Sequence, residues 1–449
     1  MNHPLTYTGH AKAVLILGLP LIGSHIAQMA IQMTDTVMMG WYGVEELAAI
    51  VLASSMFFLL FIVGAGFAFA VMPMVANAAS AGDDAQVRRV TRMGLWASAF
   101  YMIVAWPFMW WSKAWLLALG QDAVVAGFAQ NYLRIAAFGM LPSLFIMVLK
   151  SYLAALERAQ VVLWVTLAGA VLNGVLNYAL IFGHWGAPEM GIRGAATASA
   201  LMQTLSFPLL AVYAVRKMPQ HALFQRIWRF DSAAFGQVFR LGWPIGLTNL
   251  AETALFSATA IMMGWVGTLQ LAAHGIALQW GAVTFMVHVG LSNAATVRAG
   301  RAVGRKDAGG LRRGGLVAGA MSLSFASIIV VVFLSIPDTL IGVFLDRNEA
   351  ARDQILAIGV SLMAMAALFQ VADSLQVMAL GLLRGVQDAR VPLILAFISY
   401  WIVGLPAGYM FGFVWGYGAV GIWAGLVGGL GLAAILLNYR FWTRNWISP

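Results

Sequence analysis

The stretch MMGWYG at residues 38–43 returns as MMGWVG at 262–267, 224 residues later. A phrase that recurs with its surroundings in register indicates two copies of one structural unit. Towards the end of each copy the interval grows by six, so that GAPEMGI at 186–192 meets GYGAVGI at 416–422. The first interval also aligns other residues: Gly18 with Gly242, Pro20 with Pro244, Gly66 with Gly290 and Asp83 with Asp307.

The composition is that of a membrane protein. Of the 449 residues 61% are hydrophobic and 10% are charged, whereas soluble chains are about 25% charged. Cysteine is absent, which excludes disulfides, thiol catalysis and Cys-ligated metals. Apolar stretches of spanning length recur throughout and predict twelve helices. The expected ranges are 12–39, 46–77, 91–117, 127–150, 160–183, 191–216, 236–263, 271–300, 314–336, 354–381, 391–413 and 419–442.

Basic residues predict the orientation of these helices. With both termini in the cytoplasm, 21 of the 26 Lys and Arg residues fall on the cytoplasmic side, as the positive-inside rule requires. The net charge of +9 is therefore a feature of topology, and we expect no nucleic-acid partner. We expect a multi-pass protein of the bacterial inner membrane with both termini cytoplasmic. Five residues are exceptions to the bias: Lys113, Arg134, Arg193, Arg347 and Arg352.

The repeat predicts an all-α architecture of two six-helix lobes. We expect an N-terminal lobe at 1–216, a cytoplasmic linker at 217–235 and a C-terminal lobe at 236–449. An even number of spans per copy gives both lobes the same orientation, as parallel repeats. Such an arrangement is typical of transporters that alternate access to a midplane site.

Three acidic residues are expected deep inside spans: Asp35, Glu252 and Asp373. A carboxylate in the bilayer costs at least about 2.5–3.5 kcal/mol, so such residues usually carry function. The repeat aligns Asp35 with Thr259 and Glu252 with Gln28, so the two copies differ chemically at these positions. We expect all three acids to bind the coupling ion, and the alternative is a neutral carboxyl that joins helices.

Two weaker sets of candidates accompany the acids. Asn173 and Asn177 lie four residues apart on one helix face, and Thr197 follows on the next helix. Together with Asp35 they would offer hard oxygen ligands to Na⁺ or surround a proton-exchanging carboxyl; packing of helices through amides is the alternative. Pro20 and Pro244 occupy matched positions and are predicted to let their helices bend, with a static kink as the alternative.

Three longer stretches resemble one known family: LGWPIGLTNLAETALF at 241–256, GLSNAATVRAGRAVGRKD at 290–307 and FQVADSLQVMALGLLRGVQDARVPL at 369–393. They are similar to the multidrug and toxic compound extrusion (MATE) family, in particular its NorM-type branch. The pair Glu252 and Asp373 matches that branch, and Asp35 matches the family's helix 1 aspartate. Where some relatives carry a second N-terminal aspartate, this chain has Asn177.

The resemblance implies a secondary active antiporter. It would export cationic or amphiphilic organic compounds in exchange for Na⁺ or H⁺, as a monomer in the lipid bilayer, with no cofactor and no metal beyond a Na⁺ at the coupling residues. A flippase for a lipid-linked precursor of the same superfamily is the alternative. The chain lacks an HExxH motif as well as cysteine, so we do not expect an enzyme.

Overall fold

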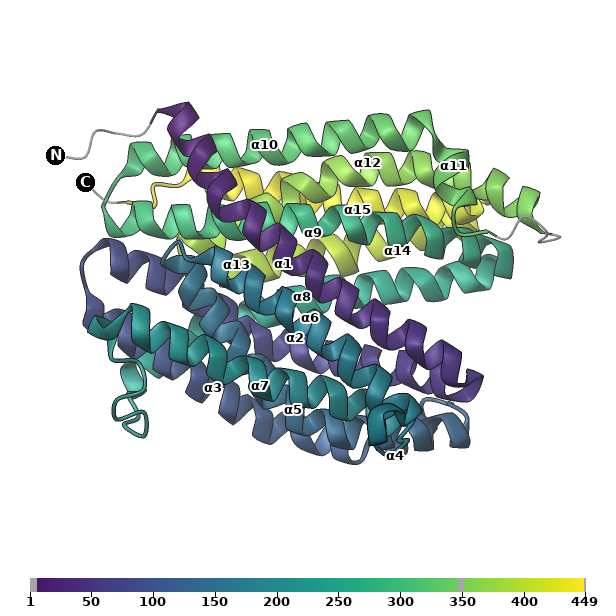
Figure 1. The fold of residues 1–449 in the computed structure, drawn as a ribbon. Helices are drawn as coiled ribbons and strands as arrows, with labels where there is room; N and C mark the ends of the chain where they lie inside the picture. Colours follow the sequence, from purple (N-terminus) through teal and green to yellow (C-terminus); the bar gives the residue numbers. More distant parts are fainter. Residues whose placement is uncertain (1–5, 346–350, 448–449) are drawn as a thin grey trace. The chain divides into compact units, whose positions relative to one another are not determined.

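The computed structural model describes residues 6–345 and 351–447. Within these ranges the chain is helical without strands, and twelve helices are long and apolar enough to cross a membrane. This confirms the predicted fold class (Figure 1). Arg347, one of the exceptions to the charge bias, lies outside the described residues.

The helices of the first half follow the expected spans in order. They are α1 (Tyr7–Tyr42), α2 (Val44–Ser80), α3 (Asp84–Trp110), α4 (Ser112–Ala118), α5 (Ala123–Ala155), α6 (Ala159–Phe182) and α7 (Ile192–Lys217), with short 3₁₀ turns η1 (His184–Gly186) and η2 (Pro219–His221).

The second half repeats this order. Its elements are α8 (Ser232–Val266), α9 (Thr268–Gly304), α10 (Ala308–Ser335), α11 (Pro337–Gly342), α12 (Arg352–Gly385), α13 (Arg390–Phe397), η3 (Ile398–Gly404), α14 (Leu405–Tyr409), η4 (Met410–Val414) and α15 (Gly418–Thr443).

The repeat is visible in local structure. Asp83 caps the start of α3 by accepting a hydrogen bond from the Gln86 amide at 2.8 Å, and Asp307 caps α10 by accepting one from Gly310 at 2.7 Å. A short acceptor side chain satisfies an amide that has no partner inside the helix. The alignment of Asp83 with Asp307 therefore reflects the same capping bond in both copies.

Two expected spans differ from the structure. The span expected at 91–117 ends at Trp110, because Trp111 leaves helical geometry (φ −106°, ψ 30°), and a separate α4 follows. The span expected at 391–413 is continuous, but η3 and η4 within it are π-helical. Pro406 lies between these segments; it has no N–H to donate, and wide turns accommodate such an interruption.

Contacts divide the chain into two compact units. The middle unit is Gly23–Gly246, and the terminal unit combines the chain up to Ile22 with the chain from Leu247 onward. These bounds differ from the expected lobes at 1–216 and 236–449, because α1 and α8 each begin in one unit and continue in the other. In each of these helices the first unit ends two residues after a proline, which is Pro20 in α1 and Pro244 in α8. The lobe boundaries themselves stay a prediction.

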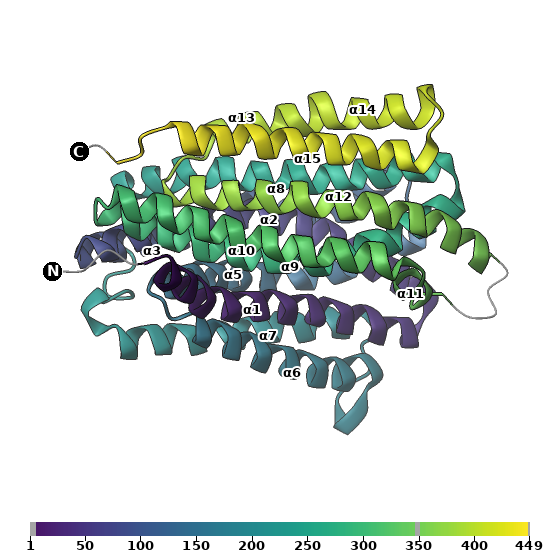
Figure 2. The same ribbon diagram turned by 90° about the horizontal axis from the view of Figure 1, so that it is seen from above.

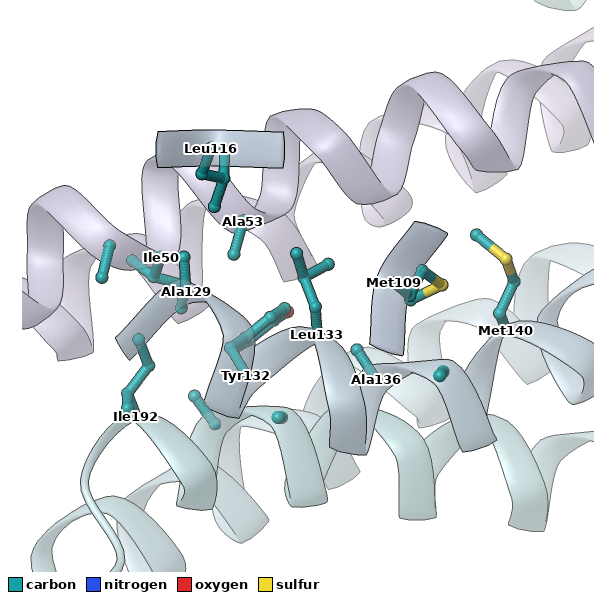
Figure 3. Packing of buried hydrophobic residues seen from close by; sticks show 14 of the residues in the cluster. Ile50, Ala53, Met109, Leu116, Ala129, Tyr132, Leu133, Ala136, Met140 and Ile192 are labelled. Carbon is teal, nitrogen blue, oxygen red and sulfur yellow. The ribbon is translucent and has the colours of Figure 1, made fainter. Parts of the chain in front are cut away.

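Within the middle unit, α2, α3 and α7 pack around α5. Its apolar core draws on several helices (Figure 3): Ile50 and Ala53 from α2, Met109 from α3, Leu116 from α4, Tyr132, Leu133 and Met140 from α5, and Ile192 from α7. Small residues let α2 approach α8: a Cβ at Gly66 would lie 2.5 Å from the Gly246 amide nitrogen.

Within the terminal unit, α12 is the central helix. It contacts α9, α10 and α15, and the α13–η4 segment lies alongside α15 (Figure 2). Two hydroxyls bind α9 to α12, since Ser292 donates to the Val377 carbonyl and Thr296 donates to the Gly381 carbonyl, each at 2.8 Å. This packing holds α12, and the polar residues on it, in a fixed position.

Candidate functional site

Asp35 is the centre of a polar cluster in the middle unit. It lies on α1 and is only 8% exposed. Asn177 on α6 donates from Nδ2 to Asp35 Oδ1 at 2.5 Å, and Ser199 on α7 donates to Asp35 Oδ2 at 3.1 Å. Asn173 donates to Ser199 at 3.2 Å, and its own carbonyl accepts from Asn177 at 3.1 Å. The cluster therefore joins three helices through one carboxyl group.

Both oxygens of Asp35 accept hydrogen bonds from uncharged donors. Such bonds favour a charged carboxylate and partly replace the water lost on burial. Within the described ranges the amide oxygen Oδ1 of Asn177 has no hydrogen-bond partner. This oxygen and the carboxylate form the kind of oxygen-rich group that binds small hard cations.

The structure brings Asn173 and Asn177, but not Thr197, into this cluster. The Thr197 hydroxyl donates to the Arg193 carbonyl of its own helix at 2.8 Å. Ser199 contacts Asp35 instead. Residues two apart point to nearly opposite sides of a helix, so only one of the two hydroxyls can face Asp35. In this structure the hydroxyl of α7 that contacts Asp35 is therefore that of Ser199, and a cation-binding role for Thr197 stays a prediction.

Glu252 and Asp373 form a second cluster, in the terminal unit. Glu252 on α8 is 8% exposed and Asp373 on α12 is fully buried. Gln376, three residues after Asp373, donates from Nε2 to Glu252 Oε1 at 3.0 Å and to the Tyr400 hydroxyl at 2.5 Å. The two carboxyl groups are close enough to interact electrostatically.

Asp373 differs from the other two acids because it lacks partners. In the part of the chain that the structure describes, neither of its carboxyl oxygens has a hydrogen-bond partner. The same holds for the Gln376 amide oxygen and the Ser399 hydroxyl. A buried carboxylate without a partner is strongly unfavourable, so the group either holds a proton or pairs with a cation.

Glu252 also has a basic neighbour. Arg384 at the end of α12 donates to the side-chain oxygen of Asn249 at 2.7 Å, and Asn249 lies one turn before Glu252 on α8. Arg384 is within electrostatic reach of Glu252. Arg384 and Asn249 lie in the stretches of sequence that resemble the family, but the sequence did not indicate a role for either of them or for Tyr400. The reason is that their contacts are made between helices.

The two prolines lie inside continuous helices, Pro20 in α1 and Pro244 in α8. Neither contributes to a carboxyl cluster. Their shared feature is that the compact units change two residues later. Helix bending at these prolines stays a prediction.

Known proteins match this chain over most of its length. The family model MatE matches residues 20–179 and 244–410, segments that begin one repeat interval apart. A probable multidrug resistance protein NorM of Rhizobium meliloti is 45% identical over 435 residues, covering 96% of this chain and 93% of the relative. A protein of the same name from Agrobacterium fabrum is 44% identical, covering 97% and 94%.

The solved structures agree on the fold. An outward-facing multidrug resistance MATE family transporter of the MOP superfamily aligns with a TM-score of 0.87 at 20% identity, covering 97% of each chain. Together with the matches in sequence, these findings confirm the predicted family: the chain belongs to the MATE family of multidrug transporters, in its NorM-type branch.

Proposed function

We propose that this protein is an antiporter that exports cationic or amphiphilic organic compounds in exchange for Na⁺ or H⁺. The names of its relatives, which are multidrug resistance proteins, support export of drugs. One observation carries the ion exchange: the buried carboxyl of Asp373 has no hydrogen-bond partner among the described residues, and it is within electrostatic reach of a second carboxyl, Glu252. The protein works as a monomer in the bacterial inner membrane with both termini cytoplasmic.

The carboxyl pair provides the exchange. Two negative charges close together in an apolar environment are unfavourable, so the pair takes up one cation, either H⁺ or Na⁺, from the outside. A cationic compound entering from the cytoplasm competes for the same negative charge. The concentration gradient of the exchanged ion drives this exchange, and each net positive charge that enters in excess of the charge exported gains about 2.3 kcal/mol on crossing 100 mV.

The surroundings rank the two acids. Glu252 has a hydrogen bond from Gln376 and the charge of Arg384 within reach, whereas Asp373 has no partner among the described residues. Asp373 is therefore the residue that needs the ion. Asp35 has two donors and acts as a second, weaker cation group with Asn173 and Asn177.

The family is one of transporters, and we infer no catalytic reaction and no cofactor. The alternative, a flippase for a lipid-linked precursor, would carry anionic headgroups and would favour basic side chains around its site. The ion-binding candidates here are acidic, which supports transport of cations. Bending of α1 at Pro20 and of α8 at Pro244 would change access to the sites.

Efflux of ethidium, a fluorescent cation, from proteoliposomes tests the proposal. A sodium gradient and a pH gradient are imposed separately on the wild type, Asp373→Asn, Glu252→Gln and Asp35→Asn. Asp338→Asn is the matched control, because Asp338 is an exposed acid on α11, outside the spans. One gradient should drive efflux by the wild type and the control, and Asp373→Asn should stop it. If neither gradient moves the dye, the antiporter is excluded and the flippase becomes the better account.

A further inference from the structure

A groove of about 600 Å³ lies between α3 and α5 of the middle unit. Its walls are apolar and include Met102, Ile103, Trp106, Trp110 and Leu141. On α3 these residues recur at the spacing of one helix face. Ile103 is 67% exposed, although α3 is long and apolar enough to cross a membrane. The groove therefore opens to the surroundings within the depth of the bilayer.

The groove has a rigid aromatic wall. The Trp106 ring contacts Phe138 of α5 edge-on, with 4.9 Å between the ring centres. The Phe138 ring also lies edge-on to Trp110, with 6.4 Å between the ring centres. Trp106 and Leu141 pack against the apolar core that includes Met109 and Met140. Because its walls are held by the core, the groove offers a preformed surface to a long apolar ligand.

One end of the groove is basic. Arg134 on α5 lies with its guanidinium 5.2 Å from the centre of the Trp110 ring and donates from Nε to the Trp110 carbonyl at 3.0 Å. The exposed Lys113 belongs to α4, and its backbone N–H donates to Gln130 at 3.1 Å. Gln130 and Arg134 are one turn apart on α5. The backbone of Lys113 is therefore held within one helical turn of Arg134, next to the end of α3.

These two residues stand out for their position and for their lack of carboxylate partners. Both are exceptions to the charge bias, at the end of α3 that the bias predicts to be outside. Within the described ranges neither forms an ion pair with an acidic side chain. Asp122, which caps α5, is twelve residues from Arg134, or about 18 Å along a helix. The two positive charges are therefore available to an anion.

We propose that this groove binds one anionic phospholipid, with an acyl chain along Ile103, Trp106 and Leu141 and the phosphate between Lys113 and Arg134. The lining on α3 runs from Ala99 to Trp110, about 16 Å, which is close to half of the roughly 30 Å hydrocarbon core. The groove thus has the length of one leaflet's chain. The basic end favours an anionic headgroup over a cationic drug.

Native mass spectrometry of protein from nanodiscs with equimolar phosphatidylglycerol and phosphatidylcholine tests this proposal. The wild type should retain phosphatidylglycerol in at least fivefold excess over phosphatidylcholine. The double variant Lys113→Gln/Arg134→Gln should lose that excess, and Arg134→Lys, which keeps the charge, should retain it. Ile103→Trp, which fills the groove, should lose retention of both lipids. Ile328→Trp is the control, because Ile328 is 61% exposed on α10, a span of the terminal unit.

Thermal melting of each variant confirms that it is folded before its lipids are counted. Equal retention of the two lipids by the wild type would overturn the proposal, as would an excess that survives loss of both charges. Retention of ethidium at the groove would assign it to a cationic drug, and a dimer mass lost in Ile103→Trp would assign it to a second copy. Both results contradict a lipid site. None of these readouts depends on transport.

Discussion

The two carboxyl clusters occupy different copies of one repeat and differ in how their charge is satisfied. Asp35 accepts hydrogen bonds from Asn177 and Ser199, so its partners are built into the fold. Asp373 has no hydrogen-bond partner within the described residues, and it interacts electrostatically with another acid, Glu252. The repeat has thus kept the helical scaffold while the chemistry of the copies diverged. In the proposed function, the second cluster is therefore the one that depends most on an ion.

Loss of Asp373 should have the largest effect. In Asp373→Asn we expect ion-driven efflux to fall about 100-fold, or about 2.7 kcal/mol, because the group that needs the ion is gone. The melting temperature should change little, since the Asp373 carboxyl forms no hydrogen bond with any residue that the structure describes. Efflux and melting are measured on the same preparation. An equal loss in Asp338→Asn, or a large fall in stability, would contradict this ranking.

Asn177→Asp should make the first cluster resemble the second. It would place a second carboxylate against Asp35, where the amide now donates at 2.5 Å. At pH 8 without sodium we expect a loss of about 2 kcal/mol, the usual result of an unsatisfied buried polar group. Sodium or acid should restore stability in melting experiments. A variant as stable as the wild type in all conditions would show that charge does not distinguish the clusters.

Ser199→Ala and Thr197→Ala form a matched pair for the geometry at Asp35. Ser199 donates to the carboxylate and Thr197 only to its own helix. We expect a loss of about 1.5 kcal/mol for Ser199→Ala, the lower end for a bond to a charged group, and much less for Thr197→Ala. Chemical or thermal unfolding in detergent measures both. A larger loss of stability in Thr197→Ala than in Ser199→Ala would favour Thr197 as the hydroxyl that interacts with Asp35.

A histidine outside the membrane also makes the stability of the protein depend on pH. This contribution must be distinguished from any pH dependence that arises at the two carboxyl clusters. Nδ1 of His221 forms a hydrogen bond of 2.5 Å with the Tyr152 hydroxyl, and its Nε2 lies 3.3 Å from Oδ1 of Asp84. Burial lowers the pKa of His221 from its usual 6.5, Asp84 opposes the shift and Arg88 adds to it. Because the folded state lowers the pKa of His221, the folded protein favours the neutral imidazole over the charged one. The free energy of unfolding therefore has its full value above about pH 6.5 and decreases as the pH falls below it.

We therefore expect the melting temperature to fall between pH 7 and pH 5 by an amount that His221→Gln reduces. The same pH series on Asp35→Asn serves as the control, because that variant keeps His221. If His221→Gln leaves the slope unchanged, the pH dependence arises elsewhere.

Much of this molecule could be predicted from the sequence, since hydrophobic stretches and a repeat are local signals. Asp83 and Asp307 aligned in sequence and cap equivalent helices. The buried acids also stood out, because a charge in an apolar stretch is rare. The sequence did not show that the three acids belong to two separate clusters. The structure shows this, because Gln376 connects Glu252 with Tyr400 in a cluster that does not include Asp35.

The remaining features depend on contacts between helices. The choice between Thr197 and Ser199 is set by the rotation of α7, which no local pattern of apolar residues fixed. Arg384 reaches Asn249 from another helix, so a search for basic residues within each acid's own span could not find it. The division of α1 and α8 between two units likewise depends on packing.

Infrared difference spectroscopy of carboxyl groups tests the central claim most directly. Spectra are compared for protein equilibrated with and without sodium, and at two pH values, in the wild type, Asp35→Asn and Asp373→Asn. The account predicts a change in a protonated carboxyl band that persists in Asp35→Asn and disappears in Asp373→Asn. A band that survives loss of Asp373, or that disappears only with Asp35, would contradict the assignment of the coupling ion to the second cluster.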